Sequence, residues 1–229
     1  MEALARSIRR TLLNRLHANR SRMLQRSISR MKSRSMGSRL PFLSLTDAIY
    51  GWGNEGWSAD EDYLARLVSE AEATTGRIVE CGSGLSTLLL ATVAARTGVE
   101  VHALEHNEEW RQRVVAALAE NGLPHVTVHA APLTNYGEFD WYSIPEELPN
   151  GVSLVVCDGP PAATLGGRYG MLPVLRSRFA TDCTILLDDA GRAPEIAILD
   201  RWQAEAGATS ERHQTRKGFA RVTIRSIPS

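Results

Sequence analysis

The sequence predicts an α/β protein built on a doubly wound, mostly parallel β-sheet. Short apolar segments alternate with segments of helical periodicity from residue 77 onward, which is typical of a parallel sheet covered by helices on both faces. Two apolar segments, SLVVCD (153–158) and TILLDD (184–189), lack polar alternation, as expected of strands buried on both faces. The chain has 229 residues, 43% of them apolar, so it is long enough for one large domain with a real core.

The elements are expected in the following order along the chain. MGSRLPF (36–42) ends an N-terminal helical segment and precedes the folded body. Ser58, with Glu61 three residues later, predicts a capping box at the start of the next helix. Strands are expected at 77–81, 99–104, 126–129, 152–157 and 184–187, and helices at 86–96, 108–121, 169–179 and 194–206. An antiparallel pair, 208–212 with 220–225, is expected to close the sheet.

The N-terminal segment differs in composition from the rest of the chain. Residues 1–39 contain ten Arg, one Lys and seven Ser but one acid, so they carry a net charge of +10 and the remainder carries −10. We therefore expect a basic helical arm of residues 1–40 before a domain of residues 41–229. Apolar residues recur every four positions in this arm, which favours a loosely amphipathic helix: Leu4, Ile8, Leu12 and Leu16.

Several functions fit this arm. The composition is that of an organellar transit peptide, and equally that of an arm that binds an anionic membrane surface. Alternatively, the helix docks on the acidic body or on a second subunit of a homo-oligomer. The arm has no aromatic residues to stack on bases, which makes nucleic acid an unlikely partner.

Composition also bears on the compartment. No apolar run reaches 18 residues, so no membrane-spanning helix is expected. The three cysteines, Cys81, Cys157 and Cys183, lie in apolar strand-like segments without the spacing of a disulfide framework or a zinc site. We expect buried, reduced thiols and a cytoplasmic location, or an organellar one if the arm is a transit peptide.

Acidic residues mark the ends of the predicted strands. Ligands of parallel sheets bind beyond the carboxyl ends of the strands, so these positions are the first place to look for chemistry. Four of the five core strands end in a carboxylate: Glu80, Glu105, Asp158 and Asp188–Asp189. Convergence of these acids on one edge of the sheet indicates a functional site.

The glycine-rich loop after the first strand restricts the choice of ligand. It reads GSGLST (82–87), so it lacks the third glycine of a dinucleotide loop, and Glu80 before it would repel a phosphate. An NAD(P)-dependent oxidoreductase is therefore disfavoured, and no phosphate-binding G-x-x-x-x-G-K-[ST] motif is present. S-adenosylmethionine suits Glu80 better, because it carries an ammonium and a sulfonium but no phosphate. Glu105 follows Gly84 by 21 residues, the position from which a carboxylate accepts the ribose hydroxyls.

These motifs resemble a known family. VECGSGLST (79–87) and ALEHNEEW (103–110) look like the first two motifs of class I S-adenosylmethionine-dependent methyltransferases. LVVCDGPP (154–161) and ILLDDAGRAPE (185–195) are similar to the fourth and fifth strand ends of the branch called methyltransferase family 24. The resemblance covers roughly residues 52–225. It implies a seven-stranded Rossmann-like sheet with an antiparallel last strand, and methyl transfer from S-adenosylmethionine.

The resemblance also implies which residues bind the cofactor. The first loop would hold the methionine part and Glu105 the ribose, while His106 and residues 131–133 would border the adenine. Ser86 departs from the glycine that many relatives have there. The implied cofactor site consists of Glu80, Gly82, Ser83, Gly84, Ser86, Glu105, His106, Pro132 and Asp158.

The remaining acids are candidates for catalysis or metal binding. Methyl transfer needs an aligned nucleophile and removal of its proton, and Asp158 and Asp188 are the candidate catalytic residues. With Asp189 they also offer hard oxygen ligands for Mg²⁺ or another divalent cation. The set resembles the metal site of catechol-type O-methyltransferases, although that site has Asp-Asn where this chain has Asp-Asp. Alternatively, these acids cap a helix or pair with Arg168 or Arg192.

Other residue types contribute less to this edge. The only lysines, Lys32 and Lys217, are expected away from it. Aromatic residues of two loops are expected either to cover the site or to pack in the core: Trp52, Trp57, Tyr136, Trp141 and Tyr142.

The sequence therefore favours transfer of a methyl group to a small-molecule acceptor, most simply to oxygen. The alternatives are the oxidoreductase, and a non-catalytic cofactor-binding module whose arm binds lipid or nucleic acid.

Overall fold

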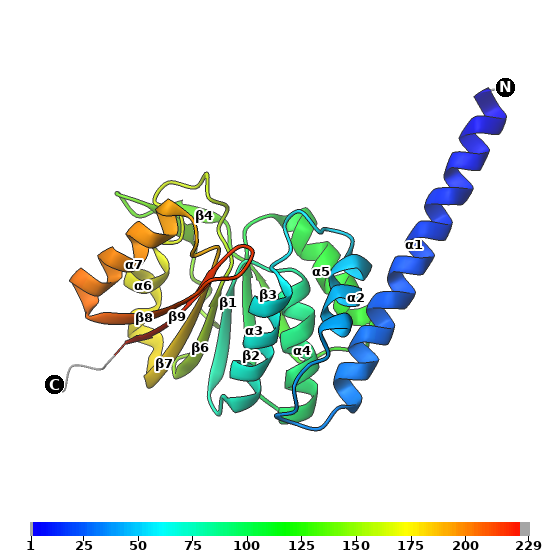
Figure 1. Ribbon diagram of the computed structural model, residues 1–229. Coiled ribbons are helices and arrows are strands. Elements are labelled where there is room, and N and C mark those ends of the chain that lie inside the picture. The colour runs from blue at the N-terminus through cyan, green and yellow to red at the C-terminus, as the bar shows by residue number, and fades with distance from the viewer. Residues whose placement is uncertain (1, 225–229) are drawn as a thin grey trace.

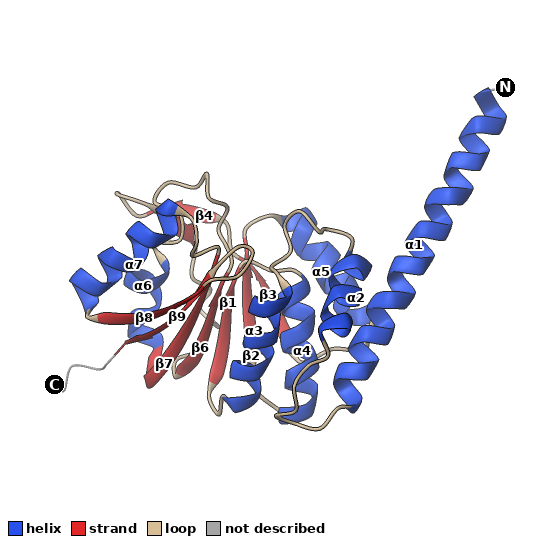
Figure 2. Cartoon of the chain, in the orientation of Figure 1, coloured by secondary structure: helices blue, strands red, loops and turns tan. Residues whose placement is uncertain are grey.

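A computed structural model describes residues 2–224, except for the side chains of residues 2–5 and Ile8. A seven-stranded sheet forms the centre, with the strand order β3-β2-β1-β6-β7-β9-β8 (Figures 1 and 2). Five strands are parallel, and β9 is antiparallel to both β7 and β8, so the predicted fold class is confirmed. The strands are β1 (Arg77–Cys81), β2 (Val101–Glu105), β3 (Val126–Ala130), β6 (Val152–Cys157), β7 (Phe179–Asp188), β8 (Ala208–His213) and β9 (Phe219–Ile224).

Helices cover both faces of this sheet. Neighbouring residues of β6 belong to different halves of the core: Val156 packs with α1 to α5, and Val155 packs with α6 and α7. This is why the strand segments are apolar without alternation. The helices are α1 (Glu2–Ser33), α2 (Phe42–Trp52), α3 (Glu61–Ala73), α4 (Leu85–Thr97), α5 (Glu108–Glu120), α6 (Met171–Leu175) and α7 (Ala193–Ala206).

Some local predictions are wrong. The cap of α3 is Asp60, whose carboxylate accepts from Tyr63 N at 2.9 Å, whereas the Ser58 hydroxyl donates to Asn54 O. The expected helix over 169–179 is only α6 and a 3₁₀ turn (Arg176–Arg178), because β7 already pairs with Val152 at Phe179. Helix α2 and the hairpin of β4 (Leu133–Asn135) and β5 (Asp140–Tyr142) were not predicted. Residue 225 of the expected last strand lies outside the described residues.

The N-terminal helix has two environments. Its first part extends beyond the body, and its second part lies against α2 (Figure 1). Leu24, Ile28 and Met31 are buried in the core on that side of the sheet. The two helix backbones approach closely because position 51 is glycine: a Cβ on Gly51 would lie 2.6 Å from Leu24 N. The division into an arm of residues 1–40 and a domain of residues 41–229 stays a prediction, with residues 24–31 contributing to the domain's core.

Two further sequence predictions concern hydrophobic segments and thiols. No helix of the described residues 2–224 is both long and apolar enough to cross a membrane. Cys81, Cys157 and Cys183 are free and buried, as predicted. The side chains of Leu4 and Ile8, half of the predicted apolar stripe in the arm, lie outside the described residues.

Candidate functional site

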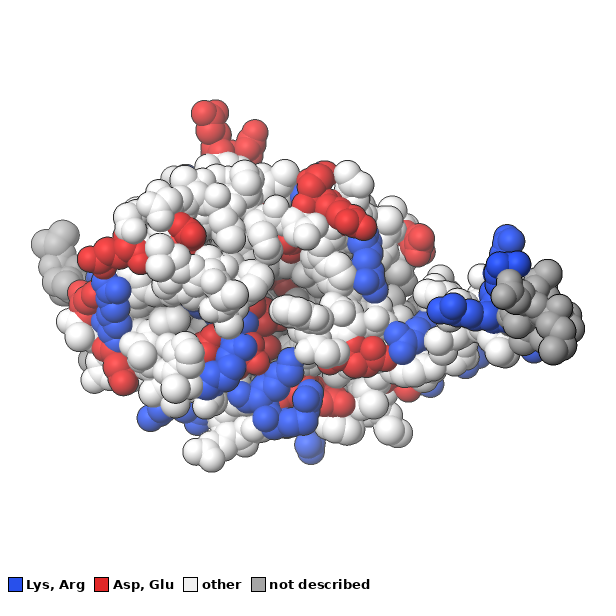
Figure 3. Space-filling model, turned by 90° about the horizontal axis from the view of Figure 1, so that it is seen from above, with Lys and Arg blue, Asp and Glu red and all other residues white. Residues whose placement is uncertain are grey.

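The strand order reverses between β1 and β6, and this topological switch point is where parallel sheets bind ligands. The loops that follow these two strands are joined by hydrogen bonds. Asp158 N and Gly159 N both donate to Cys81 O, at 3.1 and 2.7 Å. Figure 3 looks down on this edge and shows acidic side chains recessed in a hollow, with basic side chains beside them.

The glycine-rich loop approaches the β6 loop closely and leaves space elsewhere. Gly82 has φ of +90°, and a Cβ there would lie 3.1 Å from Gly159 N. Gly82 therefore serves both the left-handed backbone and the close contact. In contrast, no atom lies within 4 Å of a Cβ built on Gly84, at the N-terminus of α4. The loop thus offers open space beside the first turn of a helix, where a ligand can approach the backbone.

Glu80, at the end of β1, is buried with one oxygen unsatisfied. Its Oε2 accepts from the Thr87 hydroxyl at 2.6 Å, and that hydroxyl oxygen accepts from Gly84 N at 2.8 Å. Its Oε1 has no hydrogen-bond partner among the described residues. Burial raises the pKa of Glu80 to about 8, although the Ser86 and Thr87 hydroxyls oppose this shift. A cationic ligand group at the free oxygen would favour the ionised form.

Glu105 joins the end of β2 to the glycine-rich loop. Its Oε2 accepts from Ser83 N at 3.1 Å and from the Ser83 hydroxyl at 2.7 Å, and its Oε1 accepts from Asn107 N at 2.9 Å. The donors are neutral, and neither Glu80 nor Glu105 pairs with Lys or Arg among the residues that the structure describes. A carboxylate has about four acceptor positions, so Glu105 retains the capacity to accept further hydroxyls. We call Glu80 and Glu105 the carboxylate pair.

The other residues of the implied cofactor site lie around this pair. Ser86 is buried in the first turn of α4. His106 Nδ1 lies 3.1 Å from Glu105 Oε1 without an aligned hydrogen bond, and its ring meets that of Tyr142 edge-on, with centroids 6.1 Å apart. Pro132 is exposed between β3 and β4, and its carbonyl accepts from Ser143 N at 2.8 Å.

The structure brings Asp158, Asp188 and Asp189 together, and we call them the acidic cluster. One carboxylate oxygen of each lies within 4.8 Å of the others. Strand β7 ends at Asp188, and Asp189 has φ of +54°. This left-handed residue turns the chain so that consecutive side chains, which point to opposite faces in a strand, reach the same place.

Arg168 lies inside the acidic cluster, with its side chain 4% exposed. Its Nη2 lies 3.1 Å from Asp158 Oδ1 and 3.0 Å from Asp189 Oδ2, and also donates to Asp158 O. Its Nη1 donates to Asp188 O at 2.6 Å. Burial opposes the charge of Arg168, but Asp158 and the other carboxylates raise its pKa above the ordinary value. Pairing with arginine, the alternative to a metal site, is thus the arrangement that the structure shows.

Asp189 and Asp188, the last two carboxylates of the acidic cluster, differ in their partners. Arg192 lies 3.0 Å from Asp189, so that carboxylate has two cationic partners. Both carboxyl oxygens of Asp188 are buried without a hydrogen-bond partner among the described residues, and burial beside Asp158 and Asp189 raises its pKa well above the ordinary value. A divalent cation does not fit this donor set as it stands, because the guanidinium of Arg168 already binds two of the three carboxylates.

The expectation that Lys217 lies away from this edge is wrong. Ala190 N donates to Gly218 O at 3.0 Å, and a Cβ on Gly191 would lie 2.8 Å from Lys217 O. Burial raises the pKa of Asp158, and the charges of Arg168 and Lys217 oppose this shift. The predicted antiparallel last strand already indicated this position. Such a strand begins opposite the end of β7, with Phe219 paired to Asp188, and Lys217 lies two residues before Phe219.

The aromatic residues divide between the core and the surface. Trp141 and Tyr142 are fully buried, and Trp52 packs edge-on against Trp110. Trp57 is 73% exposed. Tyr142 is both buried and next to the site: its hydroxyl has no partner among the described residues, and a Cβ on Gly159 would lie 2.3 Å from it.

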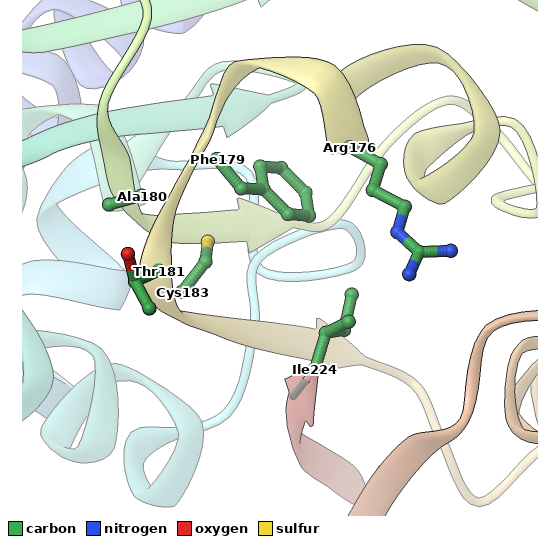
Figure 4. A pocket seen from close by; sticks show the side chains of 6 residues that line it. All are labelled: Arg176, Phe179, Ala180, Thr181, Cys183 and Ile224. Atoms are coloured by element: carbon green, nitrogen blue, oxygen red, sulfur yellow. The ribbon is translucent and has the colours of Figure 1, made fainter. Parts of the chain in front are cut away.

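A separate pocket of about 170 Å³ lies at the other end of β7 (Figure 4). It contains none of the residues expected at the site. Its lining residues are Arg176, Phe179, Ala180, Thr181, Cys183 and Ile224.

Known proteins resemble this chain in sequence over part of its length and in fold over most of it. No family model matches the chain. The chain is 30% identical over 141 residues to a protein-L-isoaspartate O-methyltransferase of Roseiflexus sp. (strain RS-1), a match that covers 54% of this chain and 60% of that relative's length.

Two solved structures are similar over most of the chain. One is an S-adenosylhomocysteine-bound methyltransferase of Podospora anserina, with a TM-score of 0.59, 13% identity, and coverage of 89% of this chain and 88% of the other. Another is an O-methyltransferase of Bacillus cereus in complex with S-adenosylhomocysteine, with a TM-score of 0.57, 15% identity, and coverage of 80% and 89%. At such identities the likeness shows the fold, and the narrower assignment to methyltransferase family 24 stays a prediction.

Proposed function

We propose that this chain, whose fold is that of the class I S-adenosylmethionine-dependent methyltransferases, transfers a methyl group from S-adenosylmethionine to an oxygen atom. The observation that carries this proposal is the carboxylate pair beside the open space at Gly84. Both acids are held by neutral donors, and Glu80 retains an unpartnered oxygen. A ligand with an ammonium and a ribose meets both requirements, whereas a pyrophosphate would find no Lys or Arg side chain paired with either acid to receive it.

The proposed roles of the cofactor-site residues follow from these contacts. Glu80 binds the methionine ammonium, and Glu105 accepts from the ribose hydroxyls. Gly82, Ser83, Gly84 and Ser86 shape the loop, and His106 and Pro132 border the adenine. When bound, S-adenosylmethionine supplies a methyl group that is already activated towards a nucleophile. The protein therefore has to align the acceptor and remove its proton.

Asp158 is the proposed general base. It follows β6, its side chain is 27% exposed, and its backbone N donates to the carbonyl of Cys81, the last residue of β1. Asp188, buried beside it, is proposed to set the charge state of Asp158, since two neighbouring carboxyls titrate as a pair. The positive charge of Arg168 offsets part of the negative charge of the acidic cluster, so its carboxylates can lie close together. We therefore propose chemistry that does not depend on Mg²⁺.

We propose a small molecule as the acceptor. The relative named protein-L-isoaspartate O-methyltransferase supports an oxygen acceptor and makes a carboxyl group of a protein the second candidate. A cytoplasmic location and a homo-oligomeric state remain predictions.

A ligand panel tests this function. Thermal shift and calorimetry would compare S-adenosylmethionine, S-adenosylhomocysteine, NAD and ATP, each with and without Mg²⁺. At a ligand concentration 100 times its dissociation constant we expect stabilisation of about 2.7 kcal/mol by the first two ligands alone. Stabilisation by NAD instead would favour the oxidoreductase. Binding that requires Mg²⁺ would contradict the role given to Arg168. Binding without any methyl transfer into metabolite or protein extracts would favour a non-catalytic module.

A further inference from the structure

The first part of α1 projects away from the rest of the molecule (Figures 1 and 3). Contact with the body begins near Arg20, which pairs with Glu55 at 2.7 Å and lies over the ring of Tyr50. Every side chain from residue 9 to residue 19 is exposed. We call residues 9–19 the projecting segment.

Apolar side chains are exposed on this segment. Leu12 is 59% exposed, Leu13 44% and Leu16 41%. Beyond the segment, Met36, Phe42 and Leu43 are also exposed, so six of the ten large exposed apolar side chains of the described residues lie between positions 12 and 43. Leu12, Leu13 and Leu16 lie within little more than one helical turn, unlike the scattered single residues of an ordinary surface, and so mark a binding surface.

The charge of the segment has one sign. Residues 3–46 contain no Asp or Glu. After residue 20 the arginines find acids of the body: Arg30 pairs with Asp47 and Arg34 pairs with Glu72. Arg9, Arg10 and Arg15 have no ion pair among the described residues. The projecting segment is therefore cationic and apolar without an internal counter-charge.

A helix of this length without tertiary contacts is marginal in water, so the exposed leucines and unpaired arginines point to a partner. A second copy would bring the same positive charge to a paired helix. Nucleic acid would supply negative charge but would not use the leucines, and the segment lacks aromatics for stacking. An anionic lipid surface uses both features, because leucines enter the interface while long arginine side chains, including Arg9 on the leucine side of the helix, extend to phosphate groups.

We propose that the projecting segment binds an anionic membrane surface, with Leu12, Leu13 and Leu16 in the lipid interface and Arg9, Arg10 and Arg15 at the head groups. This contact is independent of methyl transfer. It places the body at the membrane while residues 24–31 remain packed in the core.

Co-sedimentation of the full chain with phosphatidylcholine vesicles, with and without 30% phosphatidylglycerol, tests this proposal. We expect binding to the anionic vesicles only. Each basic residue near such a surface contributes roughly fivefold, so replacing Arg9, Arg10 and Arg15 by Gln should weaken partitioning by about 100-fold. The matched control removes three exposed arginines of the body by substitution with Gln and should retain binding: Arg201, Arg212 and Arg216.

A second variant tests the apolar contribution. Replacing Leu12, Leu13 and Leu16 by Ser should also weaken vesicle binding, by at least tenfold. Both variants should keep the melting temperature and S-adenosylhomocysteine affinity of the wild type, since the substituted side chains do not contact the body. Equal vesicle binding by the wild type and the arginine variant would overturn the proposal. So would single-stranded RNA binding that the arginine variant loses and the leucine variant keeps, or a dimer that the leucine variant dissociates.

Discussion

The carboxylate pair and the acidic cluster lie on the same edge of the sheet but are stabilised in different ways. Glu80 and Glu105 accept from hydroxyls and backbone N–H groups, and no Lys or Arg among the described residues pairs with them. Asp158 and Asp189 share the buried guanidinium of Arg168. The pair therefore has no cationic partner among the described residues, and burial keeps Glu80 largely protonated, whereas the cluster contains its own cation.

This difference assigns the two regions different tasks. A buried carboxylate without a counter-ion is costly in the free protein, so its stabilisation is left for a ligand of positive charge. A cluster that holds an arginine has less need of a metal ion. Each of the following substitutions alters either the acidic cluster or the carboxylate pair.

The largest effect is expected at the proposed base. Asp158→Asn should lower methyl transfer from labelled S-adenosylmethionine into a metabolite extract by about 10²–10⁴-fold, because the acceptor proton would lose its base. S-adenosylhomocysteine should still bind. The control is Asp182→Asn, an exposed acid near the start of the neighbouring strand β7. Transfer at the wild-type rate would remove Asp158 from the chemistry.

The next effect concerns folding. Arg168→Met leaves the acidic cluster without its buried cation and should lower the free energy of unfolding by about 3–5 kcal/mol. Urea denaturation at pH 7 measures this loss. Arg201→Met, which breaks exposed pairs with Glu138 and Glu205, should change the stability little. A similar small change for both variants would show that the cluster does not depend on Arg168.

Glu80 should make stability depend on pH. Its pKa in the native state is about 8 against an ordinary 4.5, so between these values the unfolded chain binds fewer protons and the free energy of unfolding falls as pH rises. Glu80→Gln removes this loss. Relative to that of the wild type, the free energy of unfolding of the variant should rise by about 2–4 kcal/mol between pH 5 and pH 8. Parallel pH profiles for both proteins, as expected for the exposed control Glu109→Gln, would mean that Glu80 is ionised without a ligand.

A smaller effect is expected at Glu105. Glu105→Ala removes charge-assisted hydrogen bonds to the ribose and should weaken S-adenosylhomocysteine binding by about tenfold or more in calorimetry. Glu100→Ala, an exposed acid just before β2, is the control. If both variants bind the ligand as the wild type does, the ribose is not held at the end of β2.

The sheet could be predicted from the sequence because its core strands have a continuous apolar pattern. The carboxyl ends of β1, β2 and β6 matched their predicted limits within one residue, and the acids at these ends were located for the same reason. The role of Arg168 inside the acidic cluster was only one alternative, since a residue ten positions after Asp158 is placed by the fold of the intervening loop. The position of Lys217 follows from strand pairing and not from a local pattern, because the turn between β8 and β9 lies opposite the end of β7.

Short irregular elements were also beyond the sequence pattern. The three-residue strands β4 and β5 are too short to show a period, and the residue that caps α3 also makes a contact between distant segments. Asp60 accepts from Tyr63 N and also from Thr215 in the β8–β9 turn. A local motif such as Ser58 with Glu61 contains no information on that tertiary contact.

Proton release on cofactor binding tests the central claim, that the carboxylate pair receives a cationic ligand. Calorimetry of S-adenosylmethionine binding at pH 7, in two buffers of different ionisation enthalpy, measures the protons exchanged. Glu80 is largely protonated in the free protein, and an ammonium beside it would favour its ionised form. The wild type should therefore release a large fraction of one proton more than Glu80→Gln does. Equal proton exchange by the two proteins, with binding intact, would contradict the account.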